Sequence, residues 1–254
     1  MKINHALNKI RSGQPTVGCF LGLGSPDVAE LLAHSGFDWL VVETEHNGLD
    51  SAEIQQMLTS INVTETVPLV RVPSSDKVYT QRALDMGALG IIVPMVKSAE
   101  EVTEIVGHTK YPPHGTRSWG PLRASQYTAD NEDYFENAND RIIVGVILET
   151  LDALNDLENI VSVPGLDLIV VGPWDMALSL GLDPRKLPLP EVDDILARVV
   201  DITSDTQIAV GSGSVTPEGL IKLQDAGVRF LSYGPDYALL VNSAKLGLQA
   251  FKEH

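Results

Sequence analysis

The stretches RIIVGVILET (residues 141–150) and LDLIVVGPWD (residues 166–175) are two strongly apolar runs, each with an acidic residue at or near its end. These residues, Glu149 and Asp175, are 26 positions apart (175 − 149), about the length of one strand–helix–strand unit. The hydrophobicity is continuous rather than alternating, which is typical of parallel strands covered on both faces. The pair therefore predicts two neighbouring parallel strands with a carboxylate at the C-terminal end of each.

Similar apolar, β-branched runs recur along the chain, with helical stretches between them. The strand candidates are residues 16–22, 37–43, 67–72, 89–95, 142–149, 166–172, 207–212 and 229–233. Eight alternating β and α segments predict an α/β fold of the (β/α)8 TIM-barrel type, with residues 1–254 forming a single domain. An open doubly wound sheet is the weaker alternative, because no G-x-G-x-x-G motif follows the first strand candidate.

Several sequence signals mark the beginnings of helices. Ser25-Pro26 and Thr216-Pro217 each combine an N-cap residue with a proline in the first turn, and Ser98 with Glu101 fits a capping box. One face of the last helix carries Tyr237, Leu240, Val241, Ala244, Leu248 and Phe251. We expect this face to pack on its own barrel, although a partner subunit could equally receive it.

Residues 110–140 break the alternation of strands and helices. This segment is long, polar and rich in turn residues, and such a segment inside a compact domain is usually functional or mobile. We expect it to be an active-site lid or loop insertion that contains a short helix.

The composition limits the class of partner. A net charge of −16 disfavours nucleic acids and anionic membrane surfaces, since both would repel the protein. The single cysteine, Cys19, excludes an internal disulfide and suits a reducing compartment. Residues 1–15 indicate a short amphipathic helix without the apolar core of a signal peptide, and no run approaches the ~18 apolar residues of a membrane span. We therefore expect a cytoplasmic protein that acts on small molecules.

The candidate functional residues are those at or just after the predicted strand ends, namely His46, Arg71, Lys97, Glu149 and Asp175. In a barrel the C-terminal strand ends converge on one mouth. Two carboxylates suit a hard divalent cation such as Mg²⁺ or Mn²⁺, an arginine can bind a carboxylate with two hydrogen bonds, and a histidine can transfer a proton near neutral pH. The sequence therefore predicts a metal enzyme.

Each of these residues also has a structural interpretation. A carboxylate at a strand end can simply cap the next helix, and His46 can make a structural hydrogen bond in its acidic stretch. Arg71 lies in an apolar setting and needs a charge partner, which could be a structural carboxylate. Lys97 precedes the predicted capping box and is expected to be solvated. No lysine lies within a strand candidate, which disfavours an imine mechanism.

Several motifs resemble those of a known family. They are WLVVETEHNGLD (39–50), VPLVRVP (67–73), LDMGALGIIVPMV (84–96), YPPHGTRSWG (111–120), ILETLDALNDLENI (147–160) and GPWDMALSLG (172–181). From about residue 4 to residue 250, the chain resembles the HpcH/HpaI family of class II, metal-dependent pyruvate aldolases. The resemblance implies a (β/α)8 barrel that reversibly cleaves a 2-oxo-4-hydroxy acid to an aldehyde and pyruvate or hydroxypyruvate, through a metal-stabilised enolate.

The resemblance also implies roles for single residues. Glu149 and Asp175 match ligands of a divalent ion (Mg²⁺, Mn²⁺ or Co²⁺). Arg71 matches the residue that binds the ketoacid and stabilises its enolate, and His46 matches the acid/base group.

Three further features follow from the same resemblance. Asp85 matches the partner that orients His46, and the backbone around Gly172, Trp174 and Asp175 would bind the ketoacid carboxylate. The assembly implied is a homo-hexamer in which the final helix is exchanged between subunits.

The chain departs from the family pattern around the substrate. Many members carry glutamine two positions before the metal-binding glutamate, where this chain has Ile147, and many have aspartate where it has Glu43. Trp174 should narrow the pocket. Arg117 and Arg123 in the expected lid could recognise an acidic or hydroxylated aldehyde, or be ordinary surface residues.

Two other functions remain as alternatives. A decarboxylase of the oxaloacetate type would use the same enolate. A non-catalytic ketoacid-binding protein is supported by the loss of the glutamine and opposed by the retention of His46.

Overall fold

Across residues 1–253, which the computed structural model describes, eight parallel strands close into a barrel in sequence order. The strands are β1 (Thr16–Leu21), β2 (Trp39–Glu43), β3 (Val67–Arg71), β4 (Gly90–Val93), β5 (Ile143–Leu148), β6 (Leu168–Val171), β7 (Ala209–Gly213) and β8 (Phe230–Pro235). Each strand candidate of the sequence contains or overlaps one of them. The closed order, in which β1 pairs with both β2 and β8, confirms the TIM barrel and excludes the open sheet.

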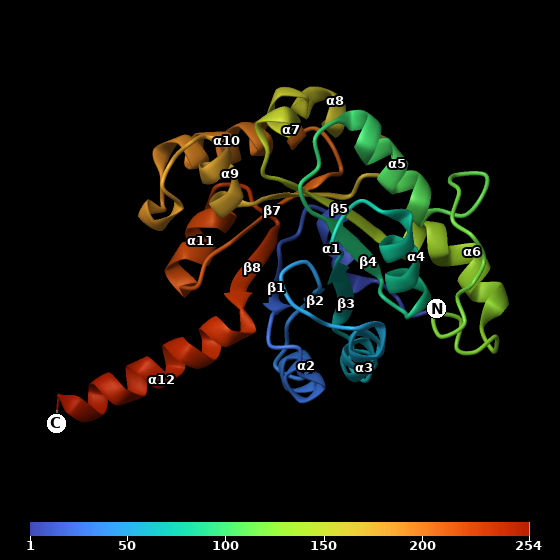
Figure 1. The fold of residues 1–254 in the computed structure, drawn as a ribbon, viewed down its shortest axis with the longest axis horizontal. Coiled ribbons are helices and arrows are strands. Elements are labelled where there is room, and N and C mark those ends of the chain that lie inside the picture. Colours follow the sequence, from blue (N-terminus) through green and yellow to red (C-terminus); the bar gives the residue numbers. More distant parts are fainter. Residues whose placement is uncertain (254) are drawn as a thin grey trace.

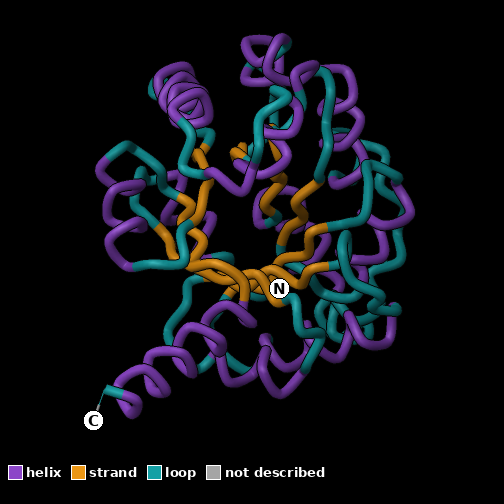
Figure 2. Tube along the Cα trace, turned by 60° about the vertical axis from the view of Figure 1, so that its left-hand side comes forward, coloured by secondary structure: helices purple, strands orange, loops and turns teal. Residues whose placement is uncertain are grey.

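Helices surround the barrel (Figure 2). They are α1 (His5–Arg11), α2 (Pro26–Ala33), α3 (Ser51–Ile61), α4 (Lys77–Asp85), α5 (Ala99–Thr109), α6 (Asn131–Arg141), α7 (Leu151–Asn155), α8 (Leu157–Val161), α9 (Pro173–Ser179), the 3₁₀-helix η1 (Pro184–Lys186), α10 (Pro190–Thr203), α11 (Pro217–Asp225) and α12 (Asp236–Lys252). Among the described residues, no helix is long and apolar enough to cross a bilayer.

Alternate residues of the strands enter two apolar clusters. On β2, Trp39 and Val41 belong to the inner cluster with residues of α1, whereas Leu40 and Val42 belong to the outer cluster between strands and helices. Trp39 stacks on Phe230 with ring centroids 3.8 Å apart. A side chain at residue 18 would collide with Trp39, because its Cβ would lie 2.1 Å from the ring. Glycine at that position makes room for the indole in the barrel.

The helix-start signals are largely confirmed. Ser25 and Thr216 cap α2 and α11 as expected. Ser98 also caps α5, but the Glu101 carboxylate accepts from the backbone N–H of Lys97 rather than from that of Ser98. The reciprocal bond of a capping box is therefore displaced by one residue. A complete capping box instead joins Asp50 and Glu53 at the beginning of α3.

Residues 110–140 connect α5 to β5. The amino group of Met1 forms ion pairs with Asp130 and Asp133, and the Arg141 side chain donates to the carbonyl of Met1. Figure 1 shows the N-terminus beside α4 and α6. The expected short helix is present as α6. Within one chain, however, the segment packs on the outside of the barrel along α4, where Thr116 accepts from Lys77 and Arg117 donates to Asp85, and not over the mouth that it was expected to cover.

The last helix does not pack on its own barrel. Helix α12 projects away from the other elements (Figure 1), and of its residues only Asp236 is buried. Its apolar side chains are exposed, including Leu240, Leu248 and Phe251. The expectation that this face covers the helix's own barrel is therefore wrong for a single chain.

Candidate active site

Arg71 and Glu43 are the last residues of neighbouring strands, β3 and β2, and are register partners. The Arg71 guanidinium donates through Nε and Nη2 to Glu43 Oε2, and its Nη1 lies 3.2 Å from Glu45 Oε2. It also lies over the Phe20 ring at 5.5 Å. The structural carboxylate that Arg71 needs is therefore Glu43, which holds the guanidinium at the mouth of the barrel.

Glu43 also fixes the loop that carries His46. Its Oε1 accepts from the backbone N–H groups of Glu45, at 2.7 Å, and His46, at 3.2 Å. The His46 side chain is 65% exposed, and its Nε2 lies 3.5 Å from Glu45 Oε2. His46 is therefore anchored through its backbone, with its ring accessible from solvent and next to a carboxylate.

Glu149 follows β5 directly and is buried. Its Oε1 accepts from the backbone N–H of Met95 at 2.7 Å. Burial raises the pKa of Glu149 to about 7, the Met95 hydrogen bond opposes this rise, and the charges of Asp175 and Glu45 add to it, while Arg71 lowers the pKa. The pKa of Glu45 is also raised, first by burial, with Arg71 and His46 opposing and Glu43 and Asp175 adding to the shift. Because the charge of Asp175 raises the pKa of both Glu149 and Glu45, these carboxylates form a negative pocket that a cation would stabilise.

Asp175 lies in the first turn of α9, which begins immediately after β6 and the N-cap Gly172. Its side chain is half-buried, and no residue from 1 to 253 donates a hydrogen bond to its carboxylate. No cluster of three or more His, Cys, Asp or Glu side chains suited to a metal is found in the described part of the chain. Two carboxylates without helix-capping bonds still fit Mg²⁺ or Mn²⁺, which accept water and substrate oxygens at their other positions.

Ile147, which stands where many family members have glutamine, lies in the wall beside Glu149. It is buried in the inner cluster, and a Cβ built at Gly172 would lie 3.0 Å from its Cγ2 and 2.7 Å from Glu149 Oε2. Ile147 therefore gives the wall beside Glu149 an apolar surface. Trp174 is 58% exposed, and Lys97 is exposed, as expected for a residue that does not belong to the site.

Asp85 is not brought to His46 within one chain. It is the last residue of α4, a nine-residue helix that runs back from the mouth by about 13 Å. Its Oδ1 instead accepts from Arg117 Nη2 at 2.7 Å. Arg117 is fully buried, donates to the Tyr134 hydroxyl, and lies over the Tyr111 ring at 4.6 Å.

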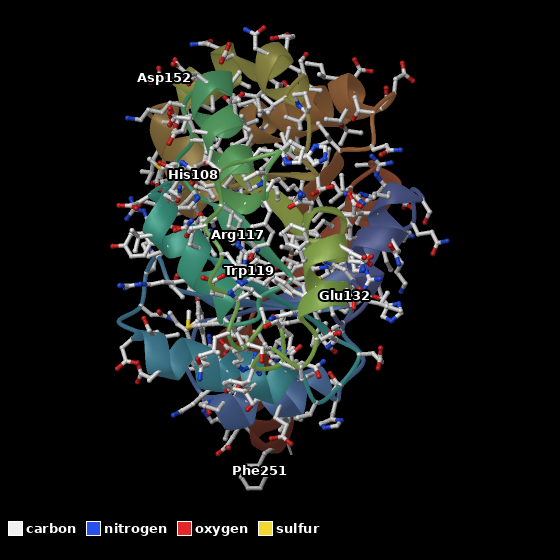
Figure 3. The ribbon with its side chains drawn as sticks, turned by 90° about the vertical axis from the view of Figure 1, so that its right-hand side faces the viewer. His108, Arg117, Trp119, Glu132, Asp152 and Phe251 are labelled. Atoms are coloured by element: carbon white, nitrogen blue, oxygen red, sulfur yellow. The ribbon has the colours of Figure 1, made fainter. Side chains whose placement is uncertain are left out.

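The outside of the barrel carries an aromatic face around Arg117, made of Tyr111, Trp119, Tyr134 and Phe135. Figure 3, which looks onto this face, shows Arg117 and Trp119 next to one another. Trp119 and Phe135 line a hollow of about 630 Å³ with Arg117. Arg123 donates to the carbonyl of Met86. Neither arginine lies free on the surface, and neither reaches the mouth of its own barrel.

Sequence reasoning missed three contributors to the mouth: the bond between Glu43 and Arg71, the Met95 N–H, and Glu45. The bond between Glu43 and Arg71 depends on the register of β2 against β3, which hydrophobic runs do not specify. The N–H of Met95 depends on a left-handed backbone, with φ of 57°, at a residue type that carries no signal for it. Glu45 was visible only as part of an acidic stretch.

Comparison with known proteins places the chain among aldolases. A model of the family described as HpcH/HpaI aldolase/citrate lyase matches residues 16–243. The chain is 34% identical to a hydroxypyruvate/pyruvate aldolase of Paraburkholderia phytofirmans, over 97% of this chain and 96% of the relative. It is 33% identical to a 4-hydroxy-2-oxo-heptane-1,7-dioate aldolase of Shigella sonnei, over 93% and 90%. A crystal structure of an HpcH/HpaI aldolase/citrate lyase family protein from Burkholderia cenocepacia superposes with a TM-score of 0.91 at 31% identity, covering 98% of this chain and 99% of that one.

Proposed function

Because the chain belongs to the HpcH/HpaI aldolase/citrate lyase family and is accordingly a carbon–carbon lyase of the aldolase type, we propose that it reversibly cleaves a 2-oxo-4-hydroxy acid to an aldehyde and pyruvate or hydroxypyruvate. The family generally depends on a divalent metal ion, and we assign Glu149 and Asp175 as the ligands. The observation that carries the proposal is the buried Glu149 carboxyl at the end of β5, held by the Met95 N–H at one oxygen, at the same mouth as Asp175 and Arg71.

Each residue of the site has a separate role in the proposed reaction. In the cleavage direction the 4-hydroxyl loses its proton, the bond between C3 and C4 breaks, and negative charge develops on the former ketone oxygen. A bound divalent cation would act as a Lewis acid toward that developing charge. Arg71, which Glu43 holds in place, would donate hydrogen bonds to the same oxygen and to the ketoacid carboxylate.

Proton transfer falls to His46. Its ring is exposed at the mouth, and its Nε2 lies 3.5 Å from Glu45 Oε2. We propose that His46 takes the proton of the 4-hydroxyl and that a proton returned to C3 completes pyruvate. The backbone at Gly172, Trp174 and Asp175 is assigned to the ketoacid carboxylate, and the indole of Trp174, exposed next to it, would narrow the space for the aldehyde.

Two features support assembly with further copies of the chain. Helix α12 exposes an apolar face that its own barrel does not cover, and burying such a face against a neighbour would be favourable. Asp85, the assigned partner of His46, lies at the far end of α4 from the mouth. We propose a homo-oligomer, a hexamer, in which α12 packs on a neighbouring subunit and Asp85 approaches the His46 of another copy. The reduced, buried Cys19 supports a cytoplasmic location.

The proposal is tested by assaying a panel of aldehydes with pyruvate and with hydroxypyruvate, each with Mg²⁺, Mn²⁺ or Co²⁺, in the wild type and in the Glu149→Ala and Asp175→Ala variants. We expect turnover that a chelator abolishes and that neither variant retains. Activity that survives chelation would remove the metal role. Decarboxylation of oxaloacetate, measured in parallel, separates the decarboxylase alternative, which the aldolase relatives do not favour.

A further inference from the structure

Met95 has a backbone conformation that its residue type disfavours. It follows β4 and the buried Pro94, and its φ of 57° lies in the left-handed region, where a side chain crowds the backbone. Its own side chain is 47% exposed, so packing of that side chain does not explain the conformation. Strain of this kind persists only where surrounding contacts impose it.

The surrounding contacts join Met95 and Val96, which follow β4, to Glu149 and Thr150, which follow β5. The Met95 N–H donates to Glu149 Oε1 at 2.7 Å. One residue further along both segments, the Thr150 hydroxyl donates to the carbonyl of Val96 at 2.9 Å, and Val96 is fully buried. Two hydrogen bonds therefore hold the end of β4 against the residues that follow β5.

The other side of the carboxylate is bounded by the end of β6. A Cβ at Gly172 would lie 2.7 Å from Glu149 Oε2 and 3.3 Å from Glu149 Cβ, so only glycine leaves the carboxylate this space. Within residues 1–253, no donor occupies Oε2. The carboxylate is thus bonded at Oε1 and confined beside Oε2, the oxygen that accepts no hydrogen bond from the described residues.

We propose that Met95 is a positioning residue, whose left-handed backbone holds the Glu149 carboxylate in the orientation that binds the metal ion. This rests on the proposed role of Glu149 as a metal ligand. The conformation of residue 95 matters because the chain is fixed on both sides of it, by β4 before it and by the Thr150–Val96 hydrogen bond after it. Any other conformation at residue 95 would shift one of these fixed segments, and with it the peptide plane that carries the N–H bonded to Oε1. The side chain of Met95 is dispensable for this task.

Two substitutions separate the backbone from the side chain. Met95→Gly removes the side chain and adopts the left-handed conformation without strain, so we expect an unchanged Kd for Mn²⁺ and a raised Tm. Met95→Val keeps an apolar side chain, but its branched Cβ opposes the left-handed conformation, so we expect the Kd for Mn²⁺ to rise by about tenfold or more. The measurements are Mn²⁺ titrations followed by electron paramagnetic resonance, and thermal unfolding, both on the full chain.

The outcomes are distinct. Equal affinity for Mn²⁺ in Met95→Val and wild type would overturn the proposal, and so would a Met95→Gly variant that is weakened as much as Met95→Val. If Met95→Val does not fold, Met95→Thr, which is also branched at Cβ, takes its place and must weaken Mn²⁺ binding, whereas Met95→Ala, which like methionine has an unbranched Cβ, must retain it. Glu149→Ala is the control. If it loses Mn²⁺ binding while Met95→Val does not, only the role of Met95 fails; if it binds Mn²⁺ normally, the proposed metal site fails as well.

Discussion

The buried carboxyl of Glu149 makes the stability of the metal-free protein depend on pH. Burial raises its pKa from 4.5 to about 7. Since the folded-state pKa is the higher one, the stabilising contribution of the protonated group is fully present below about pH 4.5 and is lost as the pH rises through about 7. The loss amounts to on the order of 3 kcal/mol in the free energy of unfolding by pH 8.

We therefore expect Glu149→Gln to increase the free energy of unfolding of the chelator-treated protein substantially at pH 8 and much less at pH 5. The glutamine oxygen can still accept from Met95, so the variant removes the charge and keeps the shape. Urea denaturation at the two pH values measures the difference, and equal effects at both would be inconsistent with a raised pKa. Adding Mn²⁺ should then stabilise the wild type and leave the variant unchanged.

Arg71 should matter more for the ketoacid than for the aldehyde. We expect Arg71→Lys to raise KM for pyruvate about tenfold or more, because an ammonium group cannot donate to Glu43 and to a carboxylate in the fixed geometry of a guanidinium. KM for the aldehyde should change little. Steady-state kinetics with each substrate varied in turn gives the comparison. A change of the same size in both KM values would mean that Arg71 only maintains the structure of the mouth and does not bind the ketoacid.

The sequence predicted a candidate residue where it also predicted the end of a strand. Glu149 and Asp175 follow strongly apolar runs, and parallel strands in a barrel bring such ends to one mouth. The partners of these residues were not predictable. Glu43 joins Arg71 through strand register, and Met95 contributes through a backbone angle that its side chain opposes.

Among the elements, α3 begins with the capping box that the sequence analysis did not identify. Asp50 accepts from Ala52 and Glu53, and the Glu53 side chain accepts from the Asp50 N–H. We expect Asp50→Ala to lower the free energy of unfolding by about 1 kcal/mol, and Asp50→Ser to recover most of this loss. Urea denaturation measures both, and Ser98→Ala at α5 serves as a comparison with a single capping bond. A loss in Asp50→Ala no larger than experimental error would mean that the capping bonds contribute nothing net.

The strands could be predicted more fully than the connections between them. Continuous apolar runs identify buried strands because both faces of a parallel sheet are covered. By contrast, the apolar face of α12 predicted that the helix is buried but did not identify the surface that buries it. The length of residues 110–140 predicted a functional segment but did not indicate its position on the barrel. The first mistake arises because an amphipathic pattern indicates that a surface is buried without identifying the surface that covers it. The second arises because the length and polarity of a segment do not indicate which end of the barrel it occupies.

In a single chain, Asp85 lies apart from His46, the histidine to which the proposed function assigns it. Within one chain α4 carries Asp85 away from the mouth and Arg117 holds it there, while α12 leaves its apolar side chains in solvent. Both observations are accounted for if a neighbouring copy supplies the missing contacts, so that His46 of one chain meets Asp85 of another.

This arrangement makes two inactive variants complement each other. His46→Ala and Asp85→Asn should each be inactive alone, but in mixed oligomers a site can combine the intact His46 of one chain with the intact Asp85 of its neighbour. With random mixing, roughly a quarter of the sites would be of this kind. Co-expression with different affinity tags, isolation of the mixed oligomer and an aldolase assay measure the recovery, with light scattering confirming a mass above the 27.4 kDa of one chain. Mixed oligomers without activity would show that Asp85 acts within its own chain or not on His46 at all, and a protein of 27.4 kDa in solution would exclude the shared site.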